Sequence, residues 1–200
     1  MRVTGSSASS VKSKSSYPRK LRIIGGRWRG RRLDVSESEG LRPTPDRVRE
    51  TLFNWLQPYI AGAHCLDLFA GTGALCLEAL SRGAAEVVMV EKASPVAQRL
   101  RQHVERLEAV GAEVVLADAV DFLQRTPRTF DIVFLDPPFK SNLIANCAAL
   151  VETRGWIRRG GLIYVEAPSR MSELVLPATW ELIRSKKAGQ VGYHLARKTA

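Results

Sequence analysis

The sequence has few of the residues that build metal centres and disulfide frameworks. It contains three cysteines and three histidines in 200 residues. The cysteines, Cys65, Cys76 and Cys147, form no CxxC pair, and the histidines lack the spacing of metal ligands. We therefore expect reduced cysteines in the core of a cytoplasmic protein, and no metal site.

Long apolar runs are also missing. No run approaches the length that spans a membrane, and the Ser- and Lys-rich N-terminus lacks the hydrophobic segment of a secretory signal. An acid-free basic leader also occurs in transit peptides, but the amphipathic periodicity of such peptides is not found here. With 45% hydrophobic and 25% charged residues, the composition indicates a soluble globular protein with one core. We expect residues 1–17 to be disordered.

Acidic residues are absent from the start of the chain. Residues 1–33 contain ten Lys or Arg and no Asp or Glu, whereas the remainder has twenty residues of each sign. The whole net charge of +10 therefore lies on this N-terminal arm. A basic stripe indicates contact with nucleic acid or another anionic surface, and the alternative is a solubilising tail. Because Arg27–Arg32 interleaves arginines with an aromatic residue and a glycine, the pattern favours RNA.

Short apolar runs follow the basic tail. Residues 21–26 and 31–35 predict the two strands of a β-hairpin. Asp46–Pro58 predicts an amphipathic helix that Thr44 caps. The helix is expected to have one apolar face flanked by two arginines: Val48, Leu52, Trp55 and Leu56, with Arg47 and Arg49 beside them.

From His64 onward, strand and helix patterns alternate, which predicts a parallel α/β sheet. Strands are expected at 65–69, 86–90, 113–117, 132–135 and 161–166, and helices at 74–82, 95–108, 119–125 and 144–152. Two further strand-like runs, 180–187 and 190–198, predict a terminal antiparallel hairpin. Five parallel strands with such a hairpin favour a seven-stranded, Rossmann-like sheet over a nicotinamide-binding fold.

The strand at 132–135 ends at Asp136-Pro137-Pro138-Phe139. Neither proline can donate to a sheet, so a carboxylate, rigid carbonyls and an aromatic ring are expected where α/β sheets bind ligands. A carboxylate and a carbonyl that accept both N–H bonds of an aromatic amino group can direct its lone pair at a methyl donor. Phe139 can stack on the base. The alternative is an ordinary turn with a helix-capping aspartate.

A glycine loop follows the first parallel strand. Gly71-Thr72-Gly73 opens a helix and lets a ligand approach backbone N–H groups. Glu91 lies at the end of the next strand, where a carboxylate can take both ribose hydroxyls. Cys76 stands where a dinucleotide-binding loop needs a third small residue, which favours a smaller adenosine cofactor. Asp118 and Ala119 suit contacts with adenine, and Asp118 suits a helix cap equally well.

Together these motifs resemble the class I S-adenosylmethionine-dependent amino-methyltransferases. The match consists of Asp67-x-Phe69-x-Gly71-x-Gly73, Glu91, Asp118 and Asp136–Phe139. Other segments resemble the bacterial RsmD-type enzymes, which methylate the exocyclic N2 of guanine 966 in 16S ribosomal RNA of the small subunit: Arg22–Gly26, Arg42–Thr44, Asp46–Glu50, Ile163–Glu166 and Ala188–Gln190. The resemblance covers residues 21–198. Its catalytic motif implies the reaction type, whereas the arm and the Arg-Pro-Thr segment imply that the methylated base is a guanine.

We expect three parts: a disordered basic tail at 1–20, an RNA-binding hairpin and helix at 21–60, and a catalytic domain at 61–200. The resemblance implies S-adenosylmethionine as cofactor and 16S ribosomal RNA as partner, within an assembly particle, for a protein that we expect to be a monomer without membrane contact. The implied cofactor contacts are Asp67, Phe69, Ala70, Gly71, Thr72, Gly73, Glu91, Lys92, Asp118, Ala119 and Asp136, and the implied catalytic residues are Asp136, Pro137, Pro138 and Phe139.

RNA contacts are expected from the basic arm and from three cations near the catalytic motifs: Arg22, Arg27, Arg29, Arg31 and Arg32, with Arg42, Arg47 and Lys140. We expect the hairpin to hold its arginines together near the active-site face. Two alternatives stay open. Amino-methyltransferases that act on another base or on protein glutamine share the catalytic motif, although the glutamine enzymes typically have Asn-Pro-Pro-Tyr. The second alternative is a non-catalytic assembly factor, and the intact Asp136, Glu91 and glycine loop argue against it.

Overall fold

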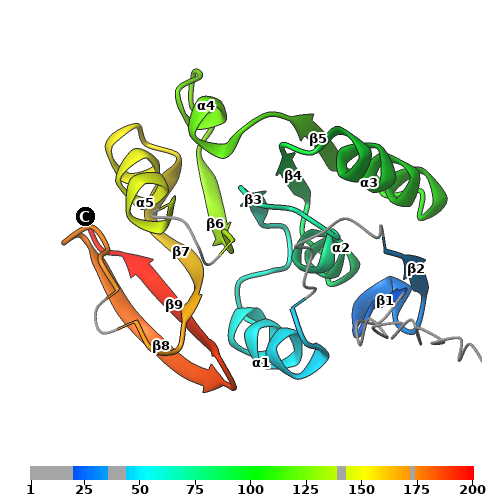
Figure 1. The fold of residues 1–200 in the computed structure, drawn as a ribbon, viewed down its shortest axis with the longest axis horizontal. Helices are drawn as coiled ribbons and strands as arrows, with labels where there is room; N and C mark the ends of the chain where they lie inside the picture. Colours follow the sequence, from blue (N-terminus) through cyan, green and yellow to red (C-terminus); the bar gives the residue numbers. More distant parts are fainter. Residues whose placement is uncertain (1–19, 36–43, 139–142, 172–173) are drawn as a thin grey trace, which may run out of the picture.

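The computed structural model describes residues 20–35, 44–138, 143–171 and 174–200. Its centre is a seven-stranded sheet in the order β5-β4-β3-β6-β7-β9-β8 (Figure 1). In that order the strands are Ala112–Leu116, Glu86–Glu91, His64–Asp67, Phe130–Leu135, Ile157–Pro168, Val191–Lys198 and Trp180–Ala188. The strands from β5 to β7 are parallel, and β8 and β9 pair antiparallel. The predicted Rossmann-like sheet with its terminal hairpin is therefore confirmed.

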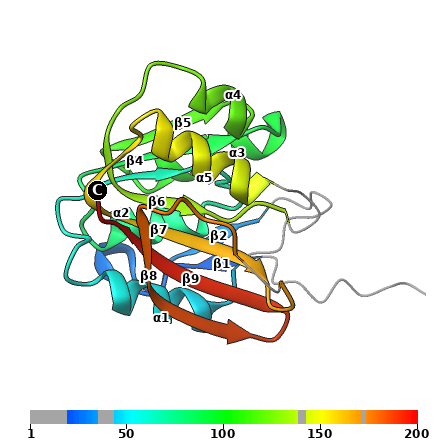
Figure 2. The same cartoon turned by 90° about the vertical axis from the view of Figure 1, so that its left-hand side faces the viewer.

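Helices cover both faces of the sheet (Figure 2). One face carries α1 (Asp46–Leu56), α2 (Ala74–Ser81) and α3 (Ser94–Arg106), and the other carries α4 (Ala119–Leu123) and α5 (Leu143–Thr153). Each face has its own cluster of buried apolar side chains. Because both faces are covered, the central strands are buried on both sides, as parallel strands usually are. Within the described residues, no helix is long and apolar enough to cross a membrane.

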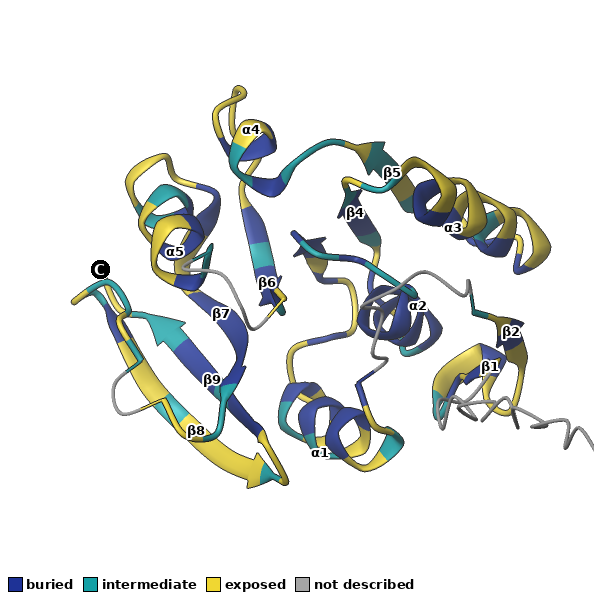
Figure 3. Ribbon diagram, viewed as in Figure 1, coloured by how far each residue is buried: buried dark blue, intermediate teal, exposed yellow. Residues whose placement is uncertain are grey.

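The basic hairpin packs on the folded body. Its strands are β1 (Lys20–Arg22) and β2 (Arg32–Asp34), and a 3₁₀ helix at Gly26–Trp28 forms its turn. It joins the same apolar cluster as α2 through four buried side chains: Leu21, Ile23, Trp28 and Leu33. Because the hairpin covers the outer side of α2, every residue of that helix is buried (Figure 3). The predicted tail lies outside the described residues, except for Lys20, which begins β1.

One side chain of α1 was assigned to the wrong environment. Arg49, predicted to flank the apolar face, is only 1% exposed, whereas Trp55 packs against the apolar cluster as predicted and keeps partial exposure. The guanidinium of Arg49 donates to Asp46 Oδ1 at 2.6 Å and to the carbonyl of Arg22 at 2.8 Å. Arginine can be buried here because both terminal nitrogens donate to acceptors, while Nε has no acceptor among the described residues. Helical periodicity could not reveal those acceptors.

Glu78 joins the hairpin to α2. Its carboxylate accepts the backbone N–H groups of Ile24 and Gly25, each at 2.8 Å. It also accepts Arg82 Nε at 2.7 Å and Arg49 Nη1 at 3.5 Å. The carboxylate is fully buried, so these four donors are what make its charge tolerable. The helix that begins at the glycine loop therefore also fixes the position of the basic hairpin.

Candidate active site at the carboxyl edge of the sheet

Three carboxylates lie at the carboxyl edge of neighbouring strands. Asp67 ends β3, Asp136 follows β6, and Glu166 lies in β7. Leu135 is in register with Val165, so the next residue of each strand is a carboxylate on the same face. Asp67 and Glu166 are buried, whereas Asp136 keeps partial exposure. Asp136 is thus the accessible member of these three carboxylates, at the edge where α/β sheets bind ligands.

Asp136 lies in surroundings that oppose its ionisation. Burial raises the pKa of its carboxyl well above the usual range, and the charges of Glu166 and Asp67 raise it further. Thr44 Oγ1 donates to Asp136 Oδ2 over 3.4 Å. The prediction that Thr44 caps α1 is therefore wrong, because Pro45 takes the cap position and the threonine hydroxyl turns to the carboxylate.

The rest of the predicted catalytic motif follows directly. Pro137 and Pro138 come immediately after Asp136, and β6 ends before them, as predicted from their lack of an N–H group. Phe139, the predicted stacking residue, lies outside the described residues.

The glycine loop lies between β3 and α2. Gly73 has a φ of +78°, and a Cβ at this position would lie 2.7 Å from Leu100, so both backbone and space require glycine. Glu91, the last residue of β4, accepts the N–H of Gly71 at 3.0 Å and the N–H of Ala93 at 2.8 Å. Its carboxylate thereby holds the loop, and its remaining lone pairs can accept hydroxyl groups from a ligand.

Asp67 and Cys76 form a buried pair beneath this loop. Cys76 Sγ donates to Asp67 Oδ2 over 2.8 Å, and the N–H of Phe69 donates to Oδ1 over 3.0 Å. Burial raises the pKa of Asp67 to about 6, and burial together with the Asp67 charge raises the pKa of the Cys76 thiol well above its usual range. At neutral pH the thiol is therefore the donor and Asp67 the ionised acceptor. All three cysteines are buried and unpaired, as predicted.

Asp118 is a helix cap. Its carboxylate accepts the N–H of Val120 at 2.9 Å at the start of α4. The cap interpretation is confirmed, and contact with adenine stays a prediction. The other predicted cofactor residues lie in the segments that follow β3, β4 and β5: Phe69, Ala70, Thr72, Lys92 and Ala119. The structure thus brings the predicted cofactor residues to one edge of the sheet. Among the described residues, no group of His, Cys, Asp and Glu could hold a metal ion.

The predicted RNA-binding arginines do not gather at one place. Arg22 donates to Asp46 Oδ2 at 3.0 Å, at the start of α1. This end of the hairpin is near the catalytic edge, because Thr44, just before α1, bonds to Asp136. Arg47 is exposed on α1. Two other predicted contacts lie outside the described residues: Arg42 and Lys140.

The turn of the hairpin lies at the opposite end of α2. The N–H of Trp28 donates to Ser81 Oγ over 3.0 Å, and a Cβ on Gly26 would come within 1.8 Å of the Ser81 carbonyl oxygen. Ser81 ends α2, an eight-residue helix about 12 Å long that begins at the glycine loop. The prediction that the hairpin holds its arginines near the active-site face is therefore wrong for Arg27 and Arg29. The close docking of the glycine turn on the helix end explains their position.

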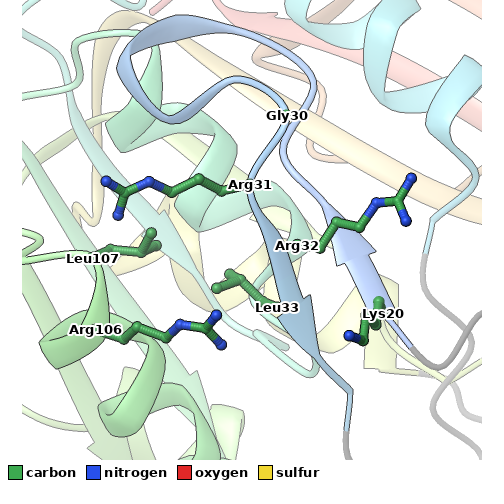
Figure 4. Close-up of a pocket in the computed structure, with 7 residues that line it drawn as sticks. All are labelled: Lys20, Gly30, Arg31, Arg32, Leu33, Arg106 and Leu107. Carbon is green, nitrogen blue, oxygen red and sulfur yellow. The ribbon is translucent and has the colours of Figure 1, made fainter.

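An open hollow of about 480 Å³ lies between β2 and the end of α3. Figure 4 shows Arg31 and Arg106 on one side of β2, and Arg32 and Lys20 on the other. Asp34 approaches two of them, at 4.0 Å from Lys20 Nζ and 3.7 Å from Arg106 Nη1. These exposed ion pairs are weak, so the cations remain available to an anion. Lys20 and Arg106 were not predicted as RNA contacts, since local patterns do not show that α3 ends beside the hairpin.

Comparison with known proteins identifies the family. A family model described as conserved hypothetical protein 95 matches residues 21–197. Ribosomal RNA small subunit methyltransferase D of Escherichia coli (strain K12) is 50% identical over 90% of this chain and 91% of that protein. The Haemophilus influenzae protein of the same name is 46% identical over 88% and 92%. The chain belongs to the ribosomal RNA small subunit methyltransferase D family.

Solved structures agree with this assignment. A methyltransferase structure from Escherichia coli has a TM-score of 0.85 at 49% identity and covers 90% of this chain and 99% of that one. A Salinibacter ruber RNA methyltransferase in complex with S-adenosyl-L-homocysteine has a TM-score of 0.61 over 79% and 94%, and at 12% identity it shows the fold alone. Membership of the D family makes this chain an enzyme of the methyltransferase class, which answers the non-catalytic alternative.

Proposed function

We propose that this D-family enzyme uses S-adenosylmethionine to methylate the exocyclic N2 of guanine 966 in 16S ribosomal RNA. The observation that carries the proposal is Asp136-Pro137-Pro138 at the end of β6, with one accessible carboxylate beside the strand that leads into the glycine loop. The relatives named for small-subunit ribosomal RNA support the substrate. The enzyme would act as a monomer in the cytoplasm, on a small-subunit assembly particle.

The residues at the carboxyl edge fit S-adenosylmethionine. The glycine loop offers N–H groups at the start of α2, and the lone pairs of Glu91 can accept the ribose hydroxyls. Asp118 and Ala119, where α4 begins, would contact the adenine. When bound, the cofactor supplies an electrophilic methyl group on a sulfonium. The three parts of the chain, with boundaries at residues 20 and 60, remain part of this proposal.

Asp136 and the Pro137 carbonyl would orient the amino group. Each accepts one N–H bond, so the lone pair that is normally delocalised into the ring is directed at the methyl group. Pro137 has no competing N–H, and its ring restricts the backbone. We predict that Phe139 stacks on the guanine after the base leaves its stack. Catalysis would come from positioning and electrostatics rather than from covalent chemistry.

The hairpin would supply the surface for the RNA backbone. Its exposed arginines extend from the catalytic edge to the far end of α2, so the cations follow a path rather than one spot. The hollow adds two residues from β1 and α3 to the predicted set: Lys20 and Arg106. A glutamine-methylating enzyme has no need of such a cationic path, which favours the RNA substrate over that alternative.

Mass mapping of 16S ribosomal RNA tests the proposal. Cells that lack the protein should lose the methyl group on guanine 966. Wild-type protein should restore it, and Asp136→Ala should not, because the amino group then lacks its carboxylate acceptor. Unchanged methylation in the deletion cells would disprove the substrate assignment, and a methylated glutamine that disappears instead would support the protein-directed alternative.

A further inference from the structure

Glu166 is a buried carboxylate that has no role in the methyl transfer proposed above. It is 3% exposed and follows Val165, which is in register with Leu135. Asp136 follows Leu135, so the two carboxylates lie on adjacent strands and on the same face. Two neighbouring carboxylates in a buried site resist ionising together, and the second one ionises only at a higher pH.

The hydrogen bonds of this pair favour ionisation of Glu166 first. The Tyr164 hydroxyl donates to Glu166 Oε1 over 2.7 Å. Burial, and then the charge of Glu166, raise the pKa of Tyr164 well above its usual range, so the phenol remains a donor. On the other side, Thr44 donates to Asp136 Oδ2 over a longer distance, 3.4 Å. The shorter bond stabilises the anion better, which leaves the proton of the pair on Asp136.

The charged groups around Asp136 oppose its ionisation, whereas the Thr44 hydrogen bond favours it. Glu166 on β7 and Asp67 on β3 both repel a negative charge at Asp136. Tyr164 on β7 and Tyr193 on β9, which is in register with Glu166, bring phenols rather than cations. Within the described part of the chain, no cation is among the groups that shift the pKa of Asp136. A cationic ligand beside Asp136 would supply a charge that balances the ionised aspartate.

We propose that burial together with the negative charge of Glu166 keeps Asp136 protonated until a cationic methyl donor binds beside it. The inference depends on the proposed use of S-adenosylmethionine. Asp136 then releases its proton to solvent and, as a carboxylate, becomes a stronger acceptor for the N–H bond of the guanine amino group. The thioether sulfur of S-adenosylhomocysteine carries no charge, so Asp136 stays protonated with the product. The carboxylate acceptor thus forms only when a methyl group is available.

A linkage between cofactor affinity and pH follows. S-adenosylmethionine prefers the ionised form of Asp136, whereas the free protein holds it protonated below its raised pKa. The affinity for S-adenosylmethionine should therefore rise with pH until Asp136 is ionised in the free protein. The affinity for S-adenosylhomocysteine should lack this rise. The difference between the two ligands isolates the effect of the positive charge.

Calorimetric titration in buffers of different ionisation enthalpy measures the released protons directly. At pH values below the raised pKa of Asp136, wild type should release up to roughly one proton more than Asp136→Asn on binding S-adenosylmethionine. Asp67, with a pKa of about 6, is mostly ionised at neutral pH and releases little there. S-adenosylhomocysteine should give no such excess. The affinity of each variant for S-adenosylhomocysteine also shows whether the site is folded.

Glu166→Gln decides the role of the second carboxylate. Glutamine can still accept the Tyr164 hydrogen bond but carries no charge, so Asp136 should ionise at lower pH and the excess proton release should fall. Glu181→Gln, the same change on the exposed side of β8, is the matched control and should keep the excess. If Glu166→Gln is unstable, Tyr164→Phe should lower the excess by weakening the Glu166 anion.

The inference is overturned if wild type and Asp136→Asn release the same number of protons, or if Glu166→Gln keeps the wild-type excess. Both results would leave the proposed methyltransferase reaction intact. A protein that binds neither ligand would contradict the proposed function instead. The two failures can therefore be told apart.

Discussion

The carboxyl edge of the sheet and the basic hairpin use charge in opposite ways. The edge places a few carboxylates in largely buried positions, where water screens them little and each strongly affects its neighbours. The hairpin exposes five arginines to solvent, where charge acts over about 10 Å at 0.1 M salt and is screened beyond that. Single residues should therefore decide the chemistry at the edge, whereas the hairpin should act through its total charge.

The largest single effect on stability is expected where the two regions meet. Arg49→Met removes a buried cation that contacts Asp46 and Glu78, and breaking a buried ion pair costs roughly 3–5 kcal/mol. Urea unfolding should show this loss. Arg47→Met, on the exposed side of the same helix, is the control and should change stability by less than about 0.5 kcal/mol. Similar unfolding midpoints for the two variants would show that the Arg49 network is not essential.

Arg49 also shows which parts of the fold the sequence could not predict. The strands and helices were predictable to within a few residues because burial on one or both faces leaves a local pattern. The register between β6 and β7, the docking of the hairpin turn on Ser81 and the pairing of Arg49 with Glu78 join positions far apart in the chain. No local pattern specifies such partners, so these contacts were missed.

The candidate site also has features that the sequence predicted and features that it could not predict. Asp136 and Glu91 could be placed in advance, because the ends of parallel strands meet at one edge. The turn of Thr44 toward Asp136, and the position of Glu166 beside it, required the three-dimensional structure. Sequence alone therefore predicted which groups reach the edge, but not how they set one another's protonation.

Asp136→Ala should have the largest effect on catalysis. It removes the acceptor that orients the amino group, and loss of one positioned polar group typically lowers the rate on the order of 100-fold or more. Single-turnover methyl transfer at saturating cofactor measures this. S-adenosylhomocysteine affinity should be close to wild type, since the protonated Asp136 makes no charged contact with the product. A rate within a few-fold of wild type would remove Asp136 from the reaction.

Glu91→Ala should weaken cofactor binding more than it slows saturated turnover. The carboxylate would bind ribose equally in the ground and transition states, so its loss removes uniform binding. A charged hydrogen bond is worth roughly 1.5–3 kcal/mol, and the variant also frees the N–H of Gly71. Calorimetry should give a dissociation constant for the cofactor that is higher by the factor corresponding to this free energy. Glu86→Ala, at the other end of β4, should leave that constant unchanged, and equal effects would argue against a ribose contact.

The smallest effects per residue are expected in the hairpin and should depend on salt. Each phosphate contact that is lost should lower the slope of log affinity against log salt by roughly 0.7–0.9. Two double variants separate the turn from the hollow, and each removes two charges: Arg27→Gln with Arg29→Gln, and Arg31→Gln with Arg106→Gln. We expect each double variant to lower this slope by the amount that corresponds to one or two lost phosphate contacts. Cofactor affinity should stay unchanged.

Two controls make the hairpin experiment decisive. Arg101→Gln removes a charge from another part of α3, where the guanidinium donates to the carbonyl of Val114, and should leave the slope unchanged. Deletion of residues 1–17 should also cost little, because a segment predicted to be disordered cannot fix the register of the RNA. If both hairpin variants keep the wild-type slope, the arm is a solubilising element. The RNA surface would then have to lie around Arg42, Arg47 and Lys140, close to the catalytic motifs in sequence.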